Sequence, residues 1–295
     1  MKRIFLLFIT AASAVSAWCA EEAKTLVINE LMQSNVENIM DDITEFPDSW
    51  VELYNPSDDA INLKDYKIGT KDKVEKAWQL PDKTVPAKGY VVIYCDKEGK
   101  EDNRLHADFR LESGKDGNLY LFKGDEIVDK LEGMAKMPAP DVAYGRKTDG
   151  ADEWGYQLTP SAGKANTGEI CDAKHILGAP VFSEKGRVVS GNATINLTLS
   201  LPDGAPEGAV IRYTTNGSEP TATSTKYTSA INITKTKVIR AKVFCDGWLS
   251  PVSSAQSYIF HPRAMTTPIF SVQTDDKYLN DKTIGLFPKI GRAHV

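Results

Sequence analysis

Cysteine is scarce in this sequence: four residues are spread over 295 positions. The clustered spacing that a disulfide scaffold or a zinc site requires is missing. Export of the chain would permit a disulfide, so Cys95 and Cys171 are candidates for one bond. Cys245 extends the apolar face of a predicted strand, 238–244, and we expect it to be a buried thiol.

Long apolar runs are also missing after the N-terminus. Lys2 and Arg3 precede an apolar run over 4–15 and small residues that end at Ala17, which predicts a secretory signal peptide over residues 1–17. Its roughly twelve apolar residues are too few to span ~30 Å of hydrocarbon. We therefore expect a secreted or cell-surface bacterial protein without a transmembrane span. Lipidation of Cys19 is the alternative, although the bulky Trp18 stands where a lipoprotein signal has a small residue.

The chain lacks an excess of positive charge. Its 35 Lys and Arg face 40 Asp and Glu, a net charge of −5, and removal of the signal peptide takes Lys2 and Arg3 and leaves −7. Nucleic-acid binders carry a basic patch, and none is visible here. A nucleic-acid partner is therefore not expected.

Catalytic motifs are missing too. The sequence has no Gly-x-Ser-x-Gly elbow, no HExxH, no phosphate-binding GxxxxGK[ST] loop and no CxxC pair. Its histidines, at positions 106, 175, 261 and 294, have no ligand partner at helical spacing. We expect no cofactor and no enzyme activity from these residues. The acidic loop Asp41, Asp42, Glu45 and Asp48 is a weak candidate for Ca²⁺, but its spacing fits no EF-hand and favours a solvated loop.

What is present is β-strand signal almost throughout. Short β-branched and aromatic runs alternate with turn residues, and the clearest strand covers 194–201, where apolar and polar positions alternate. Gly124-Asp125 predicts a two-residue hairpin turn, and Asn216-Gly217 predicts a second turn. About 295 residues suffice for two domains. The pattern predicts an all-β chain, with two sandwiches separated by a polar, Gly- and Pro-bearing linker.

The first half of the chain carries a recognisable series of motifs. VINELMQSN (27–35), DSWVELYNPSDDAINLKDYKIG (48–69), WQLP (78–81), VPAKGYVVIYCD (85–96), LHADFRLESGKDGNLYLF (105–122), VAYGR (142–146) and LTPSAGKAN (158–166) follow in order. Together they resemble the lamin-tail domain of secreted bacterial proteins, which implies an immunoglobulin-like sandwich. In that fold Glu52 and Asn55 are expected to be strand-end groups that bond neighbouring backbone. Trp50, Trp78 and Trp154 are expected in core or rim packing.

A second series centres on IRYTTNGSEPTATSTKYTSAINITKTKVIRAKVFCDGWLSP (211–251). It resembles the C-terminal immunoglobulin-like module of chitobiase and β-hexosaminidase type proteins, a module that accompanies an enzyme and does not perform hydrolysis. Trp248, Tyr213 and Tyr227 are candidate ligand-binding residues that could stack a sugar ring. Structural packing of the same three side chains is the favoured alternative.

A third segment, TPIFSVQTDDKYLNDKTIGLF (267–287), is similar to the opening of the spore-coat protein H (CotH) kinase-like family. The final IGRAHV is what one reading frame of a common sequencing adaptor would encode, so we expect a truncated gene with a non-native tail. The predicted organisation is listed in chain order: signal peptide 1–17, lamin-tail domain 24–168, linker 169–179, chitobiase-type module 180–262, truncated kinase-like start 263–288 and tail 289–295.

These observations predict a non-catalytic module pair for tethering, spacing or recognition, accessory to a kinase-like domain beyond the present residues. Loops on a rigid scaffold would supply its specificity for an extracellular protein or glycan. Two alternatives stay open. One is a carbohydrate-binding protein, and the other is a fragment of a secreted CotH-type kinase.

Overall fold

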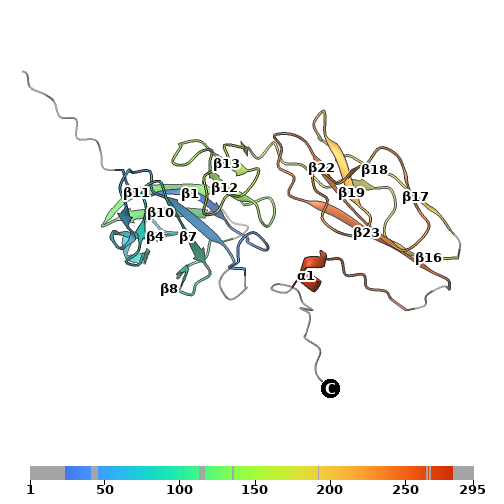
Figure 1. The fold of residues 1–295 in the computed structure, drawn as a ribbon, viewed down its shortest axis with the longest axis horizontal. Helices are drawn as coiled ribbons and strands as arrows, with labels where there is room; N and C mark the ends of the chain where they lie inside the picture. Colours follow the sequence, from blue (N-terminus) through green and yellow to red (C-terminus); the bar gives the residue numbers. More distant parts are fainter. Residues whose placement is uncertain are drawn as a thin grey trace, which may run out of the picture.

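The computed structural model describes residues 24–40, 46–101, 103–112, 117–134, 136–191, 193–263, 265 and 267–281. This part of the chain is built almost wholly from β-strands. Figure 1 shows two β-rich modules next to each other along the longest axis, the first coloured blue to green and the second yellow to orange. The prediction of an all-β chain with two sandwiches is confirmed. The predicted signal peptide and Cys19 lie outside the described residues.

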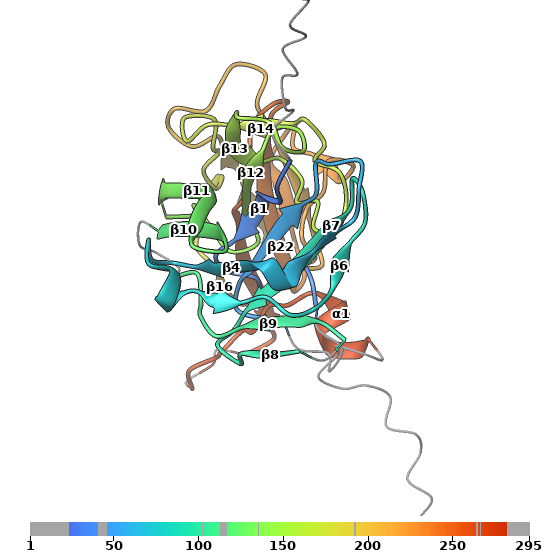
Figure 2. The same cartoon turned by 90° about the vertical axis from the view of Figure 1, so that its left-hand side faces the viewer.

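The first module contains a large and a small sheet that face each other (Figure 2). The large sheet has the spatial order β14 (Ile170–Cys171), β13 (Trp154–Gln157), β12 (Ala143–Arg146), β1 (Val27–Met32), β2 (Trp50–Tyr54), β7 (Tyr90–Cys95), β9 (Leu105–Ala107) and β8 (Lys100–Glu101). The small sheet has the order β11 (Glu126–Met134), β10 (Gly117–Lys123), β4 (Tyr66–Gly69) and β5 (Trp78–Gln79). A separate pair joins β3 (Ile61–Asn62) to β6 (Thr84–Val85), and the 3-10 helices are η1 (Leu63–Asp65) and η2 (Val74–Lys76).

Alternation along β2 explains the packing of the large sheet. Val51 and Leu53 are fully buried in the core between the two sheets, whereas Trp50 and Glu52 are buried on the opposite face. Pairing of β1 with β2 shifts register at Asn29, and this bulge allows both Ile28 and Leu31 to reach the core despite their odd spacing. The large sheet is therefore covered on both faces, and polar side chains lie buried beneath its outer cover.

The predicted hairpin at Gly124-Asp125 is confirmed. Lys123 pairs with Glu126 across a two-residue turn, and Gly124 has a φ of 59°. A positive φ at the first turn position is what a type II′ turn requires. The turn fixes the register of β10 against β11, and β11 is an edge strand.

The second module has one sheet of five strands and two short pairs. The five-stranded sheet has the order β16 (Arg187–Ser190), β23 (Ser253–His261), β22 (Lys237–Phe244), β19 (Val210–Thr214) and β20 (Thr225–Lys226). The pairs are β15 (Val181–Phe182) with β18 (Leu199–Ser200), and β17 (Ile195–Leu197) with β21 (Ile231–Ile233). Strands β16 and β23 run parallel over four registered positions, and the other strand pairs of this module are antiparallel.

The strand predicted over 194–201 is divided in two. Ile195, Leu197 and Leu199 are buried as the alternation indicates, but Leu201 is 38% exposed. The division arises because β17 pairs with β21 and β18 pairs with β15, so the segment passes from one partner to the other. Cys245 is half-buried rather than buried, because it follows the last residue of β22 and packs at the margin of the core.

The cysteine pairing considered from the sequence is wrong. Cys95 and Cys171 are both buried free thiols in the same sheet. Cys95 lies in β7 and Cys171 in β14, with four strands between them. Five strand spacings of about 4.8 Å separate them by roughly 24 Å, far beyond the ~6 Å between Cα atoms that a disulfide permits.

The predicted linker, 169–179, is largely ordered by hydrogen bonds. Its first residues form β14, so the large sheet extends to Cys171. Ile176 then pairs with Leu249 of the second module, and the backbone bonds Leu177 N to Leu249 O (2.8 Å) and Leu249 N to His175 O (2.9 Å) flank this bridge. Leu249 packs in the core cluster of the first module, whereas Leu177 packs in that of the second. The second module thus contributes an apolar side chain to the core of the first, and the connecting segment contributes one to the core of the second.

Helix α1 (Asp276–Asn280) lies beneath this junction in Figure 1. Asp275, just before it, accepts a hydrogen bond from Glu219 N (2.9 Å) in the second module. The Tyr278 hydroxyl donates to the Glu37 carboxylate in the first module. The segment that follows β23 therefore contacts both modules.

Candidate functional site

The structure does not join the three predicted ligand-binding residues in one platform. Tyr213 and Tyr227 meet edge to face, with ring centroids 6.5 Å apart, and both pack against the core of the second module. Trp248 instead meets the His175 ring of the linker edge to face at 4.7 Å. It borders a hollow of about 540 Å³ with Arg212 and Phe244, a hollow that neither tyrosine lines. Tyr213 and Tyr227 thus have packing contacts with each other and with this core.

Most of the acidic loop suggested for Ca²⁺ lies outside the described residues, namely Asp41, Asp42 and Glu45. Asp48 is described, and its carboxylate pairs with the Arg110 guanidinium at 2.6 Å. This ion pair gives Asp48 a structural role at the start of β2.

Three carboxylates beneath the outer face of the large sheet hold the 149–166 segment in place. Glu30 and Glu52 are registered opposite each other on β1 and β2 and are fully buried. Glu30 accepts hydrogen bonds from the backbone N and the hydroxyl of Ser161, at 3.0 and 2.6 Å. Glu52 accepts from Asn29 Nδ2 (2.9 Å) and Gly163 N (2.6 Å). We call Glu30, Glu52 and Asp149 the buried acid cluster.

Asp149 completes the cluster through the bulged residue of β1. Its carboxylate accepts from Asn29 Nδ2 (3.0 Å), Asn166 N (3.0 Å) and the Tyr90 hydroxyl (2.5 Å). The prediction that Glu52 lies at a strand end is wrong, since it is central in β2. Asn55 does end that strand, and its Nδ2 donates to the carbonyls of Asp59, Val85 and Pro86, as predicted.

Burial raises the pKa of Glu30, and it raises the pKa of Glu52 to about 8, against the hydrogen bonds from Asn29 and Gly163 that favour the charged form. Paired acids with raised pKa values are common in hydrolases, but such acids must reach a substrate. Glu30 and Glu52 are 0% exposed, and Ser161 and Gly163 occupy the space above them. The buried acid cluster therefore has a structural role, which is to hold the 149–166 segment against the large sheet.

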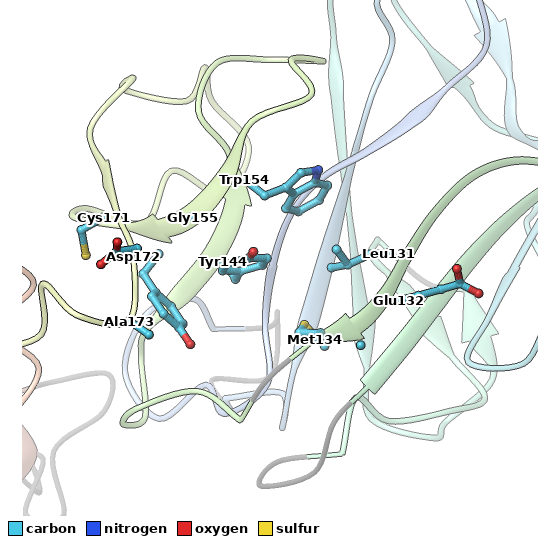
Figure 3. A pocket seen from close by; sticks show the side chains of 11 residues that line it. Leu131, Glu132, Met134, Tyr144, Trp154, Gly155, Cys171, Asp172 and Ala173 are labelled. Atoms are coloured by element: carbon cyan, nitrogen blue, oxygen red, sulfur yellow. The ribbon is translucent and has the colours of Figure 1, made fainter.

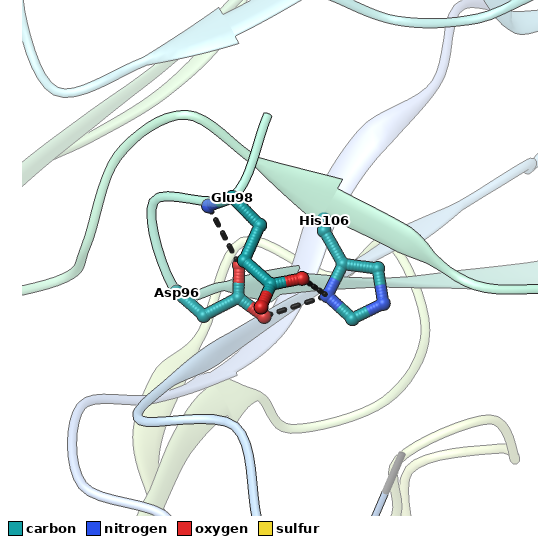
Figure 4. A group of neighbouring side chains, drawn as sticks. All are labelled: Asp96, Glu98 and His106. Carbon is teal, nitrogen blue, oxygen red and sulfur yellow. Dashed lines mark hydrogen bonds and ion pairs between the residues drawn. The ribbon is translucent and has the colours of Figure 1, made fainter. Parts of the chain in front are cut away.

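The sequence shows no ligand partner for His106 at helical spacing. The fold nevertheless places this residue beside two carboxylates (Figure 4). Its Nδ1 lies 2.6 Å from Asp96 Oδ2 and 3.6 Å from Glu98 Oε2. Its side chain is 3% exposed, and its ring meets that of Tyr94 edge to face. The β7–β9 pairing sets Tyr94 opposite His106, so Asp96, two residues after Tyr94, reaches the ring.

Asp96, Glu98 and His106 are the described residues whose donor atoms could together hold a divalent cation, because these atoms lie within 4.8 Å of one another. The 2.6 Å contact is, however, the length of a direct charge-assisted hydrogen bond. Lys100 Nζ also lies 2.5 Å from Glu98 Oε2. The hydrogen bond with His106 and the ion pair with Lys100 therefore already engage both carboxylates at the β8–β9 edge.

An aromatic cleft opens between the two sheets of the first module (Figure 3). Tyr144 from β12 and Trp154 from β13 stack with centroids 5.6 Å apart and planes 23° apart. Tyr156 meets Tyr144 edge to face at 5.3 Å. Leu131 and Met134 of edge strand β11 form the opposite wall, and the cavity measures about 260 Å³.

Arg146 fixes the inner end of this cleft. Its guanidinium lies 4.9 Å from the Trp154 ring centroid and donates from Nε to Ile28 O (2.7 Å). It also pairs at 2.9 Å with Asp129 of β11, which joins the small sheet to the large one. Trp50, Trp78 and Trp154 all pack on or in the cores, as predicted, but Trp154 also borders the cleft.

The sequence does contain a signal for this cleft. Tyr144 and Arg146, and likewise Trp154 and Tyr156, are two residues apart, so each pair lies on one face of its strand. Pairing of Tyr144 with Tyr156, and of Arg146 with Trp154, brings all four side chains together. That register is not visible without the structure.

These features define two immunoglobulin-like β-sandwich modules. Comparison with known families agrees. Residues 20–133 match the Lamin Tail Domain, and residues 185–254 match the Chitobiase/beta-hexosaminidase C-terminal domain. Comparison with curated proteins and with solved structures gave no match.

Both family matches stop short of the segment compared with the CotH kinase-like family, which lacks support from them. Strands β12 to β14 follow the first matched segment and complete the large sheet. Among the helices of the described residues, none is long and apolar enough to cross a membrane.

Proposed function

We propose that this chain acts outside the cytoplasm as a non-catalytic spacer and recognition unit, in which two sandwich modules are held at a fixed angle. The observation that carries the proposal is the junction at Ile176, Leu177 and Leu249. Domains joined by a polar linker move relative to each other by default, whereas an apolar interface restrains them. Here Leu249 of the second module packs in the core of the first, and Leu177 of the connecting segment packs in the core of the second.

Charged residues of the second module also lie at this junction. The Glu219 carboxylate contacts the Arg240 guanidinium and lies 3.2 Å from Lys242 Nζ. Asp275 adds a second carboxylate, 3.6 Å from Arg240. Glu219, Arg240 and Lys242 line a cleft between the modules, on the side where Asp275 and α1 approach. This network anchors Asp275 to the second module, and Tyr278 of the same segment donates to Glu37 of the first module.

Small-angle X-ray scattering of the mature chain tests the spacer. We expect the scattering curve of one rigid, two-module particle. Replacement of residues 173–178 by a Gly/Ser segment of equal length removes the Ile176–Leu249 bridge and should broaden the distance distribution. The same replacement at 203–208, a solvent-facing loop of the second module, is the matched control. A wild-type curve already typical of two freely jointed bodies would refute the spacer.

Export and tethering belong to the same proposal and rest on the sequence. We expect N-terminal sequencing of the exported protein to begin after Ala17. Mass spectrometry would reveal a lipid on Cys19 if the alternative lipoprotein signal operates. In this arrangement the modules would space a following domain from the surface, and the resemblance of 267–287 to the CotH kinase-like family names a candidate for that domain.

A further inference from the structure

The aromatic cleft has polar groups without partners. Tyr66, Tyr90, Tyr94 and Tyr120 of the first module all form hydrogen bonds through their hydroxyls. Within the described part of the chain, no such bond is found for the hydroxyl of Tyr144 or of Tyr156. Neither hydroxyl oxygen is one of the fully buried atoms that have no hydrogen-bond partner. A largely buried tyrosine normally finds a partner for its hydroxyl. Two solvent-accessible hydroxyls on residues that line one cavity are therefore available to a hydrogen-bonding ligand.

Burial raises the pKa of both tyrosines, so their hydroxyls stay protonated at neutral pH. A protonated phenol can both donate and accept a hydrogen bond. Alcohol groups have the same dual capacity, so they match this pair better than a pure donor or a pure acceptor does.

The charges at the rim are already engaged. Glu132 accepts from the Tyr120 hydroxyl (2.8 Å) and pairs with Lys130 (2.6 Å), and Figure 3 shows its carboxylate turned away from the rings. Asp172 pairs with the His175 ring at 2.7 Å. A site for a cationic ligand would need an unpaired carboxylate, or several exposed aromatic ring faces that surround the cation. Here the Arg146 cation already lies over the Trp154 ring. The cleft therefore favours an uncharged ligand.

The walls are apolar and the volume is small. Leu131 and Met134 supply aliphatic surface, and the Tyr144, Trp154 and Tyr156 side chains supply aromatic surface. Drug-sized ligands occupy about 300–1,000 Å³, so ~260 Å³ suits one ring rather than a long chain. A pyranose ring combines an apolar C–H face with several hydroxyls at its edge.

We propose that the cleft between β11 and the β12–β13 hairpin binds a single ring of a neutral saccharide, with Tyr144 and Tyr156 hydrogen-bonding its hydroxyls. The site rests on the proposed recognition function and gives it a ligand class. The ring packs between the aromatic side chains and the Leu131–Met134 wall. The site lies in the first module, away from the Trp248 platform suggested by the sequence.

Saturation-transfer NMR and calorimetry on the mature chain test this site. The probes are glucose, galactose, mannose, N-acetylglucosamine and neutral disaccharides of these sugars. At least one should bind, and its signal should be strongest for protons on one face of the ring. Choline and N-acetyl-proline amide serve as a cationic and a peptide-like competitor.

Tyr156→Phe and Tyr144→Phe remove one hydroxyl each and keep the rings in place. Each should weaken saccharide binding about 3- to 10-fold with an unchanged melting temperature. Tyr213→Phe in the second module is the control and should bind like the wild type. Absence of binding by every sugar, equal binding by the Tyr→Phe variants, or preference for choline or the proline amide would overturn the proposal. Rigid scattering together with failed sugar binding would reject this site and leave the spacer intact.

Discussion

Replacement of Glu52 by glutamine should change how stability depends on pH. In the folded chain burial raises the pKa of Glu52 to about 8, whereas the ordinary pKa of a glutamate carboxyl is 4.5. Between these values the folded state holds a proton that the unfolded chain has lost. Stability conferred by this group is therefore complete below pH 4.5 and is lost as the pH rises through 8. Glu30, whose pKa is also raised by burial, acts in the same direction.

The two pKa values of Glu52 set the magnitude. Between pH 5 and pH 8.5 the wild-type free energy of unfolding should fall by about 4 kcal/mol through Glu52 alone. That is a large share of the 5–15 kcal/mol typical of a domain. The side chain of the Glu52→Gln variant cannot ionise. The fall of the free energy of unfolding with pH that Glu52 causes should therefore disappear in this variant. The variant should be less stable than the wild type at pH 5, because its amide nitrogen cannot accept from Gly163 N or Asn29 Nδ2.

Urea unfolding from pH 5 to pH 8.5 measures this slope, with tryptophan fluorescence as the signal. At pH 8.5 the order should reverse, and Glu52→Gln should be the more stable protein. Glu132→Gln is the matched control, because its carboxyl is fully exposed and hydrogen bonds from Lys130 and Tyr120 hold its pKa below the usual range. Wild-type stability that is flat or rises over this range, or a Glu52→Gln variant that keeps the wild-type slope, would refute the reasoning.

Three further changes address other parts of the structure. Arg146→Met should destabilise the first module by about 3–5 kcal/mol in urea, because it leaves the Asp129 carboxylate without its cation between the sheets; an effect below 1 kcal/mol would contradict that role. His106→Asn should cost about 1–3 kcal/mol in the same assay through loss of the bond to Asp96, and unchanged stability would show that the pair is not structural. Gly124→Ala should cost about 1–2 kcal/mol, since its φ is 59°; calorimetry with Gly178→Ala as a control checks this value.

Local patterns predicted much of the fold. The turn at Gly124-Asp125 depends on two adjacent residues, and the burial of Ile195, Leu197 and Leu199 follows a period of two. Both features can therefore be predicted from the sequence. The division of that strand was not, because it depends on which partners β21 and β15 offer. Local pattern determines burial, whereas pairing determines where a strand ends.

The candidate site shows the same limit. Tyr144 and Tyr156 become neighbours through the register of β12 on β13, and the far wall of the cleft comes from β11 of the other sheet. His106 meets Asp96 because β9 returns parallel to β7. Trp248, which the sequence suggested with Tyr213 and Tyr227, borders a hollow that neither tyrosine lines, because it follows β22 and packs on His175. The sequence predicts Trp154 as a packing residue and singles out neither Tyr144 nor Tyr156, because sheet order decides which aromatic side chains share a space.

The parallel pairing of β16 with β23 has a mechanical consequence. Arg187 to Ser190 lie beside Tyr258 to His261 in the same direction, near the entry and the exit of the second module. Tension applied through the two ends of this module pulls these strands past each other lengthwise. Their hydrogen bonds, which run across the strands, then resist the load together rather than opening one after another. We expect the second module to withstand stretching far better than peeling, a useful property in a chain that connects a surface to something beyond it.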